Sequence, residues 1–350
     1  MSPEDLIPLR WSGAAPAPDL APFNCALGNG APLPAPDLTS VTVVTTAPWP
    51  SVRMSRTGAA VAGPTGDPWV NANGWRIQML RARDRKPVWL DTKPDSTNLE
   101  LALAEAETYG GRWVAATDAA TFPKLQNAIN FFETHKHWRT WRPVARLAVV
   151  SDFVGPNEYP AGEYLNLLSR RQIPYLLNGD TESAKAVVLF DHKPVQIEVY
   201  LRWVRAGGLL IVPPGTRTGS APIEHGHKIF PEGKGRIAVA ETPWTDPYQS
   251  ATRTHLLFSR RNDTLRLWNA GTVNAHYVES RDEKSAVVHL LNYGPRSTDN
   301  TSLWTTKPYQ SVTLKTLSGP PTTLRPVPVN GGTELALPPL GPYTAIELTA

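Results

Sequence analysis

Four short apolar runs separated by helical segments decide the fold of the central part of this chain. They are VARLAVVSDF at 144–153, IPYLLNGD at 173–180, AVVLFD at 186–191 and LLIVPPGT at 209–216. Between the last two, VQIEVYLRWVRAGG carries apolar residues at helical spacing and ends in Gly207-Gly208. Continuous apolar runs that alternate with helices are typical of parallel strands buried on both faces. We therefore predict an open, flavodoxin-like α/β domain over residues 143–245.

The region before this domain has a similar rhythm. SVTVVTT at 40–46, PVWLD at 87–91 and RWVAAT at 112–117 are expected strands, and helices are expected over 74–83, 98–109 and 123–138. Alternating strands and helices are typical of parallel sheets and β/α barrels. We predict a partial β/α barrel-like region over 40–142, preceded by an irregular Pro/Gly-rich segment over 1–39.

After about residue 245 the pattern changes to strands alone. Six β-rich runs follow one another with turn residues between them, which predicts an antiparallel β-sandwich over 246–350. The runs are VNAHYVES at 273–280, SAVVHLLNY at 285–293, QSVTLKTL at 310–317, TTLRPVPV at 322–329, TELALPP at 333–339 and YTAIELT at 343–349. The fold class expected for the whole chain is thus α/β plus β.

Composition excludes several classes of function. The 350 residues carry a net charge of +4, but the basic residues are spread out, which argues against nucleic acid as a partner. The sequence has no long apolar segment and no secretion signal, so a membrane partner is not expected and the localisation stays unknown. No dinucleotide fingerprint or phosphate loop is present, and no cofactor is expected. The one cysteine, Cys25, cannot form an internal disulfide.

Several motifs together resemble the C-terminal portion of multidomain glycoside hydrolases of the family 42 β-galactosidase type and related bacterial hydrolases. They are AEAETYGGRWVAAT at 104–117, the block from 145 to 216, GKGRIAV at 233–239, and VVHLLNYGP with LPPLGPYTAIEL near the C-terminus. The resemblance implies a barrel end, an amidotransferase-like α/β domain without its cysteine, and a C-terminal sandwich. It also implies an oligo- or polysaccharide partner and a middle domain that serves packing or homo-oligomer formation.

The sequence departs from that family in its barrel. A complete eight-stranded barrel needs about 200–250 residues, whereas only residues 1–142 precede the α/β domain. The family's two catalytic glutamates have no clear match here. Two functions therefore stay open: a hydrolase that cleaves a glycosidic bond with paired carboxylates, or a non-catalytic relative that binds saccharide or mediates oligomeric assembly.

Carboxylates at the ends of the expected strands are the candidate catalytic groups, since reactive side chains of parallel β/α folds lie there. Asp91 and Asp118 follow strands of the barrel-like region and form the candidate catalytic pair. Alternatively, each caps the following helix or turn. Asp152 and Asp191 also follow strands, and we interpret them as structural.

Four tryptophans lie on or beside the same strand ends and are candidate substrate-binding platforms, since flat aromatic faces stack on sugars. They are Trp49, Trp69, Trp89 and Trp113. The alternative is that they pack between the barrel-like region and a neighbouring domain.

Two histidine pairs have the spacing of a metal chelate, His135 with His137 and His225 with His227. Neither pair has a third ligand at a telling distance in the sequence, so no metal site is predicted.

Overall fold

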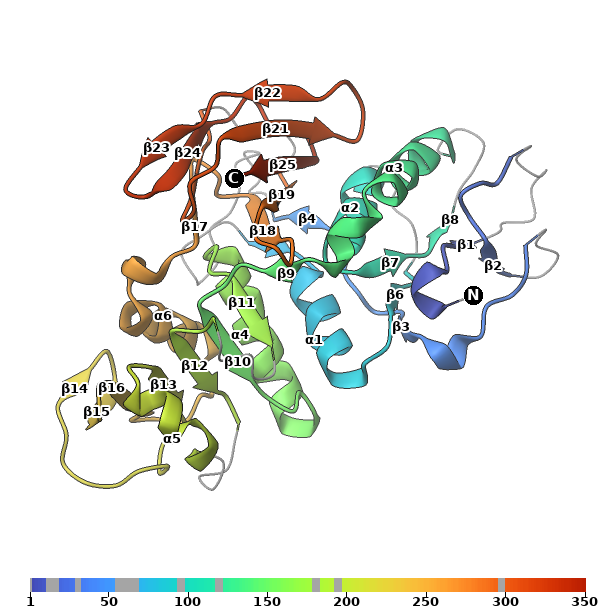
Figure 1. The fold of residues 1–350 in the computed structure, drawn as a ribbon. Coiled ribbons are helices and arrows are strands. Elements are labelled where there is room, and N and C mark those ends of the chain that lie inside the picture. The colour runs from blue at the N-terminus through green and yellow to red at the C-terminus, as the bar shows by residue number, and fades with distance from the viewer. Residues whose placement is uncertain are drawn as a thin grey trace. The chain divides into compact units, whose positions relative to one another are not determined.

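The computed structural model combines helices with several β-sheets (Figure 1), which confirms the mixed α/β plus β class. It describes residues 2–10, 19–28, 33–53, 69–92, 98–116, 122–177, 183–191, 197–294 and 300–350. In that part of the chain, no helix is both long enough and apolar enough to cross a membrane.

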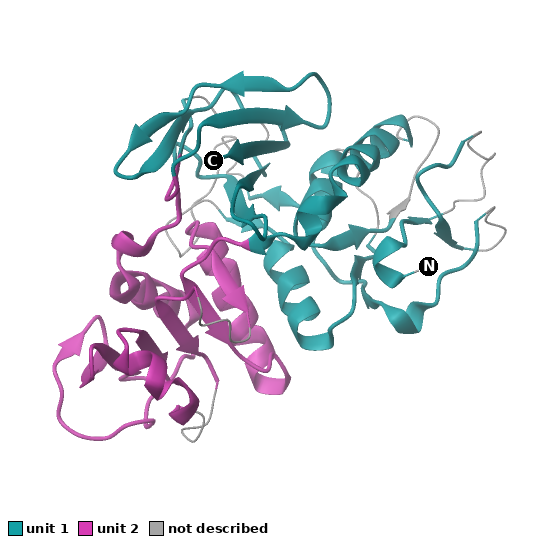
Figure 2. Ribbon diagram, viewed as in Figure 1, with its two compact units in different colours: residues 1–142, 267–303, 308–350 teal, residues 143–266, 304–307 magenta. Residues whose placement is uncertain are grey.

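The chain divides into two compact units (Figure 2). Unit 1 comprises residues 1–142, 267–303 and 308–350, and unit 2 comprises residues 143–266 and 304–307. Strand β9 (Arg142–Pro143) lies where the chain passes from the first unit into the second. Unit 1 is therefore built from both ends of the sequence.

The N-terminal part of unit 1 holds short parallel strands. Strand β1 pairs with β2 and with β8, and β6 pairs with β3 and with β7. Since β7 and β8 are separated by Val114 alone, the order β2-β1-β8/β7-β6-β3 links all of them, and its two outer strands are consecutive in the chain. The strands are β1 (Pro8–Arg10), β2 (Cys25–Leu27), β3 (Thr42–Val44), β6 (Val88–Leu90), β7 (Gly111–Trp113) and β8 (Ala115–Ala116), with a separate antiparallel pair β4 (Ser51–Val52) and β5 (Val70–Asn71).

One apolar cluster joins the strands of this arrangement. Cys25 from β2, Val41 before β3, Trp89 from β6 and Val114 after β7 pack together and are almost without solvent exposure. Strands at both ends of the pairing order thus contribute to the same core. Burial raises the pKa of the Cys25 thiol to about 11, so this side chain is an inert part of the packing.

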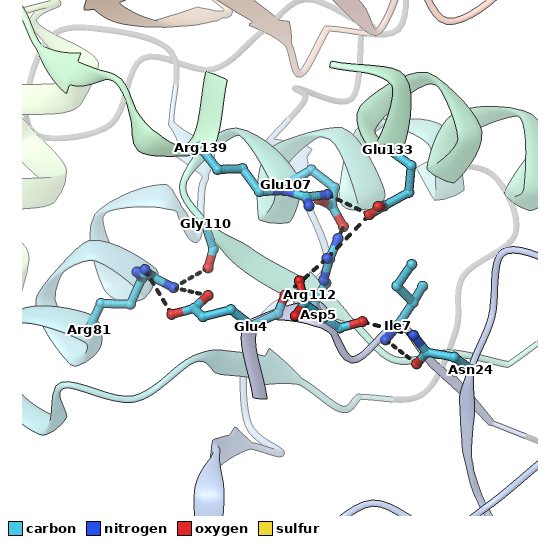
Figure 3. Close-up of polar contacts among 10 residues, drawn as sticks. All are labelled: Glu4, Asp5, Ile7, Asn24, Arg81, Glu107, Gly110, Arg112, Glu133 and Arg139. Atoms are coloured by element: carbon cyan, nitrogen blue, oxygen red, sulfur yellow. Dashed lines mark hydrogen bonds and ion pairs between the residues drawn. The ribbon is translucent and has the colours of Figure 1, made fainter. Parts of the chain in front are cut away.

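Strands β1 and β2 lie within the segment for which an irregular structure was expected. Each has only three residues between prolines and glycines, too short for an alternating pattern to be visible in the sequence. Side-chain amides hold this segment in place (Figure 3): the backbone N–H of Ile7 donates to Asn24 Oδ1 at 2.8 Å, and Asn24 Nδ2 donates to the carbonyl of Asp5 at 2.8 Å.

Three helices belong to the same region: α1 (Gly74–Asp84), α2 (Leu99–Thr108) and α3 (Phe122–Thr134). Helix α2 is buried along nearly its whole length, because it packs on β7, on its neighbours α1 and α3, and on the C-terminal strands β19 and β25. Helix α3 is amphipathic. Its apolar stripe of Leu125, Ala128, Ile129 and Phe132 is buried, and its other face is exposed.

The C-terminal third of the chain forms two mainly antiparallel sheets. The larger contains the order β22-β21-β25-β19-β18, and the smaller has the order β17-β20-β24-β23. The strands are β17 (Leu265–Trp268), β18 (Val273–Glu279), β19 (Ser285–Asn292), β20 (Ser302–Thr305), β21 (Ser311–Thr316), β22 (Thr322–Leu324), β23 (Val327–Val329), β24 (Gly332–Ala336) and β25 (Tyr343–Thr349).

Unit 2 contains a seven-stranded sheet of order β11-β10-β12-β13-β16-β15-β14. The first five strands in this order are parallel, and both faces of the inner ones are buried, as continuous apolar runs predict. The strands are β10 (Leu147–Val150), β11 (Tyr175–Leu177), β12 (Ala186–Leu189), β13 (Leu209–Val212), β14 (Ile223–Glu224), β15 (His227–Glu232) and β16 (Gly235–Ala240), and the helices are α4 (Glu158–Arg170), α5 (Glu198–Arg205) and α6 (Pro247–Phe258).

Gly235 marks a close backbone approach within unit 2. A Cβ atom at this position would lie 2.1 Å from the carbonyl oxygen of Val204 and 2.3 Å from that of Gly208. Neither backbone oxygen can move without displacing α5 or β13. We expect Gly235→Ala to lower the free energy of unfolding by about 1–3 kcal/mol in urea denaturation.

Gly341→Ala is the matched control, because a Cβ there meets nothing within 4 Å. That variant should stay within about 0.5 kcal/mol of the parent. Equal effects of the two substitutions would contradict the close-approach explanation.

Candidate functional site

Asp91 lies where the sequence places it, directly after β6 at the carboxyl end of the parallel strands. Its backbone N–H donates to the carbonyl of Val44, the last residue of the neighbouring strand β3. Its carboxylate forms a two-point ion pair with Arg10, the last residue of β1. Arg10 Nε donates to Asp91 Oδ1 at 3.2 Å, and Arg10 Nη2 donates to Oδ2.

This ion pair joins the ends of two strands that are far apart in the sequence. The Asp91 side chain is 14% exposed and that of Arg10 is 41% exposed, so the pair is open to solvent on the arginine side. The planar guanidinium holds both carboxylate oxygens in a fixed orientation. A carboxylate so held can stabilise positive charge or act as a base or nucleophile. Asp118, the proposed partner of Asp91, lies outside the described residues.

The four candidate tryptophans differ in exposure. Trp89 is fully buried in the core cluster of the parallel strands, and Trp113 is 3% exposed. Trp49 and Trp69 are both half-buried. Trp49 packs edge-on against Trp113 with ring centroids 4.6 Å apart, whereas Trp69 donates its Nε1–H to Asn71 Oδ1 at 3.2 Å. Of these four rings, those of Trp49 and Trp69 are therefore the more accessible ones.

A buried ion cluster in unit 1 was not predicted from the sequence (Figure 3). Arg112, in the middle of β7, donates through Nη1 to Glu107 Oε1 and lies 3.4 Å from Glu133 Oε1. Arg139 Nη2 contacts the same two carboxylates, at 2.7 Å from Glu107 Oε2 and 2.8 Å from Glu133 Oε1. Although burial opposes it, hydrogen bonds and positive charge from both arginines lower the pKa of Glu133.

The four charges of this cluster balance, and its side chains satisfy one another. Arg81 extends the polar contacts toward the N-terminal segment, through a 2.6 Å hydrogen bond to the carbonyl of Gly110 and a 3.3 Å ion pair with Glu4. We interpret this network as structural, because the Glu107 side chain at its centre is only 1% exposed.

Glu105, two residues before Glu107 on α2, is a second buried carboxylate. Its Oε1 accepts a hydrogen bond from the backbone N–H of Asn73 at 2.7 Å and another from the hydroxyl of Tyr293, while its Oε2 accepts from Asn73 Nδ2 at 3.1 Å. Burial raises the pKa of this carboxyl despite the hydrogen bonds it accepts. Glu105 thereby fixes α1, α2 and the end of β19 to one another.

Unit 2 brings together the two aspartates that we interpreted as structural. Asp152 follows β10 and Asp191 follows β12. These two strands are adjacent in the sheet, and the chain places β11 on one side of β10 and then β12 and β13 on its other side. Asp191 Oδ2 accepts hydrogen bonds from Ser151 Oγ at 2.9 Å and from the backbone N–H of Asp152 at 3.3 Å. Burial, together with a hydrogen bond and negative charge from Asp152, raises the pKa of Asp191 to about 6.

The histidine pairs are held by local contacts. His135 Nδ1 lies 2.8 Å from the carbonyl of Phe131, and His227 Nδ1 lies 3.1 Å from the carbonyl of His225. Among the described residues, no group of three or more histidine, cysteine, aspartate or glutamate side chains has the geometry to hold a metal ion.

Comparison with solved structures finds glycoside hydrolases with a similar fold. The chain is similar to α-L-fucosidase isoenzyme 2 from Paenibacillus thiaminolyticus, with a TM-score of 0.57 and 11% identity over 78% of this chain and 62% of that one. It also matches the β-galactosidase from Bacillus circulans sp. alkalophilus, with a TM-score of 0.48 and 10% identity over 78% of this chain and 62% of that one. The match to the β-galactosidase of the haloarchaeon Halorubrum lacusprofundi has a TM-score of 0.45 and 11% identity over 85% of this chain and 57% of that one.

These likenesses concern the fold. The chain spans 62% of the length of the fucosidase and of the Bacillus β-galactosidase, and its identity to each is low. No protein-family model matches the sequence, and no curated protein matches it. The comparison thus shows a fold similar to that of the fucosidase, and activity has to be argued from the residues of this chain.

Proposed function

We propose that this protein is carbohydrate-active and of the glycoside hydrolase type. The observation that carries the proposal is Asp91, a carboxylate clamped by Arg10 at the carboxyl ends of parallel strands, in a fold shared with a fucosidase. In this proposal the parallel strands of unit 1 are a shortened β/α barrel, unit 2 is the flavodoxin-like domain, and the C-terminal sheets form a sandwich. The carboxyl ends of such barrel strands carry the reactive groups.

The two carboxylates would have different roles. Asp91, held in a fixed orientation by the guanidinium of Arg10, would act either as the nucleophile at the anomeric carbon or as the base that activates a water molecule. Asp118 would then protonate the oxygen of the leaving group. Trp49 and Trp69 would offer ring faces to the sugar, while the buried Trp89 and Trp113 would support the strand ends from within.

A turnover assay on a panel of nitrophenyl glycosides tests this function. The panel should include α-fucosides and β-galactosides, together with glucosides, arabinosides and xylosides in both anomeric forms. We expect release of nitrophenol from at least one of them. Well-folded protein that turns over none of the panel, and none of the corresponding oligosaccharides, would contradict the hydrolase proposal.

A specific observation favours a second function, a non-catalytic relative that binds saccharide or mediates assembly. Both oxygens of Asp91 are engaged by Arg10, and the pairing order of parallel strands in the described residues is shorter than a complete barrel. For this alternative we expect saccharide binding in calorimetry without turnover. For the assembly role, we expect the sedimentation mass to rise with protein concentration, and we expect the association to involve unit 2.

A further inference from the structure

A cavity of about 390 Å³ lies in unit 1 between helix α3 and the turn that joins β21 to β22. The helix contributes Asn127, Asn130 and Phe131, and His135 follows directly after it. The strand side contributes Lys315 and Leu317. Its volume is in the range of pockets that hold small molecules. This cavity could not be predicted from the sequence, because its two walls are far apart in the chain.

The spacing of residues along α3 explains the composition of the helical wall. Positions 127, 130, 131 and 134 share the face of the helix opposite its buried apolar stripe. Asn127 and Asn130 are exposed, and neither side-chain amide has a hydrogen-bond partner in the described part of the chain. Beside them, the ring of Phe131 is half-buried. This wall therefore offers two open amides next to an aromatic ring.

The floor of the cavity is a fixed polar cluster. Lys315 Nζ lies 2.8 Å from Glu347 Oε2, 3.2 Å from His135 Nε2 and 5.7 Å from the centre of the Trp138 ring. His135 stacks on Trp138 with ring centroids 4.3 Å apart. Since its Nδ1 faces the carbonyl of Phe131, Nδ1 is the donor and Nε2 accepts from the lysine.

The charge of this floor decides the class of ligand. The ammonium of Lys315 is already balanced by Glu347, so an anion entering the cavity would have to compete with a carboxylate at 2.8 Å. A neutral polyhydroxyl compound meets no such obstacle. Its hydroxyls can bond to the amides of Asn127 and Asn130, and a C–H face can rest on Phe131.

We propose that this cavity is a binding subsite for a neutral sugar residue, distinct from the strand ends that carry Asp91. The choice of a saccharide as ligand rests on the proposed carbohydrate function, while the existence and polarity of the cavity do not. In this role the subsite holds a part of an oligo- or polysaccharide away from the reacting bond.

Hydrogen–deuterium exchange with bound sugar tests the location. Neutral galactose, fucose and their short oligosaccharides should slow exchange in residues 122–140 and 309–324. Galacturonate at the same concentration should have a weaker effect. Protection confined to residues 86–92 would place binding at the strand ends and overturn the subsite.

Calorimetry on variants tests the residues. We expect the double variant Asn127→Ala with Asn130→Ala to weaken sugar binding roughly tenfold, the effect of losing two hydrogen bonds. Lys124→Ala, an exposed change on the same helix outside the cavity, is the matched control and should bind as the parent does. Unchanged binding by the double variant would overturn the proposal.

The two proposals fail separately. Binding lost with the double variant but without any turnover of the parent would keep the subsite and refute the hydrolase. If turnover depends on Asp91 but the double variant binds oligosaccharide as the parent does, the hydrolase proposal stands and the subsite is refuted. Absence of both binding and turnover would refute both.

Discussion

Asp91→Asn is expected to reduce kcat on any accepted glycoside by about 10²–10⁴-fold, the range for loss of a catalytic proton-transfer or nucleophilic group. The amide keeps the shape of the side chain but removes its charge, so it can neither attack the anomeric carbon nor activate a water molecule. The measurement is the initial rate with nitrophenyl and alkyl glycosides of the same sugar. Because Arg10 is 41% exposed, the free energy of unfolding should change by only about 1 kcal/mol or less.

The leaving group separates the roles of the two aspartates. Asp118→Asn should slow alkyl glycosides far more than nitrophenyl glycosides, because nitrophenolate leaves without protonation, whereas Asp91→Asn should slow both alike. Asp37→Asn is the matched control, a fully exposed aspartate that precedes β3 at the opposite end of the strands. Wild-type turnover by Asp91→Asn would remove Asp91 from the mechanism.

Arg112→Ala is expected to lower the free energy of unfolding by about 3–5 kcal/mol, the usual loss when one partner of a buried ion pair is removed. The Arg112 side chain is 7% exposed and Glu107 is 1% exposed, so Glu107 would keep a buried charge with only Arg139 beside it. Urea denaturation at neutral pH measures the effect.

Two further variants test this explanation. Arg205→Ala removes an ion pair with Glu232 whose arginine is 59% exposed, and it should cost less than about 1 kcal/mol. Adding Glu107→Gln to Arg112→Ala should recover part of the loss, because it removes the excess negative charge that two carboxylates and the one remaining arginine, Arg139, leave in the cluster. If Arg112→Ala lowers the free energy of unfolding no more than Arg205→Ala does, the buried cluster contributes little to stability.

The sequence predicted the parallel strands of unit 2 well, and the reason is physical. Their apolar runs are continuous because both faces of the sheet are buried, and Gly207-Gly208 ends α5 before β13 begins. The helices of unit 1 were likewise predictable, since α3 carries its apolar residues at helical spacing. The proposed boundaries of the four sequence regions stay predictions.

Other features depend on contacts between distant segments and leave no local pattern. Arg10 and Asp91 are separated by 81 positions, and only the pairing order of the strands brings them together. The exposure of the tryptophans also depends on contacts with distant segments. Trp49 and Trp89 look alike in the sequence, yet one is half-buried and the other belongs to the core.

The packing of α2 against β19 and β25 has a consequence for the order in which the chain acquires structure. Residues 143–266, almost all of unit 2, emerge during synthesis before the strands that complete unit 1. Unit 2 can therefore fold while α2 still lacks its cover and Glu105 still lacks the Tyr293 hydroxyl. Until the C-terminal strands have been synthesised, the apolar surface of α2 is exposed and can bind chaperones or aggregate. Stable folding of the first third of the chain therefore depends on synthesis of the last third.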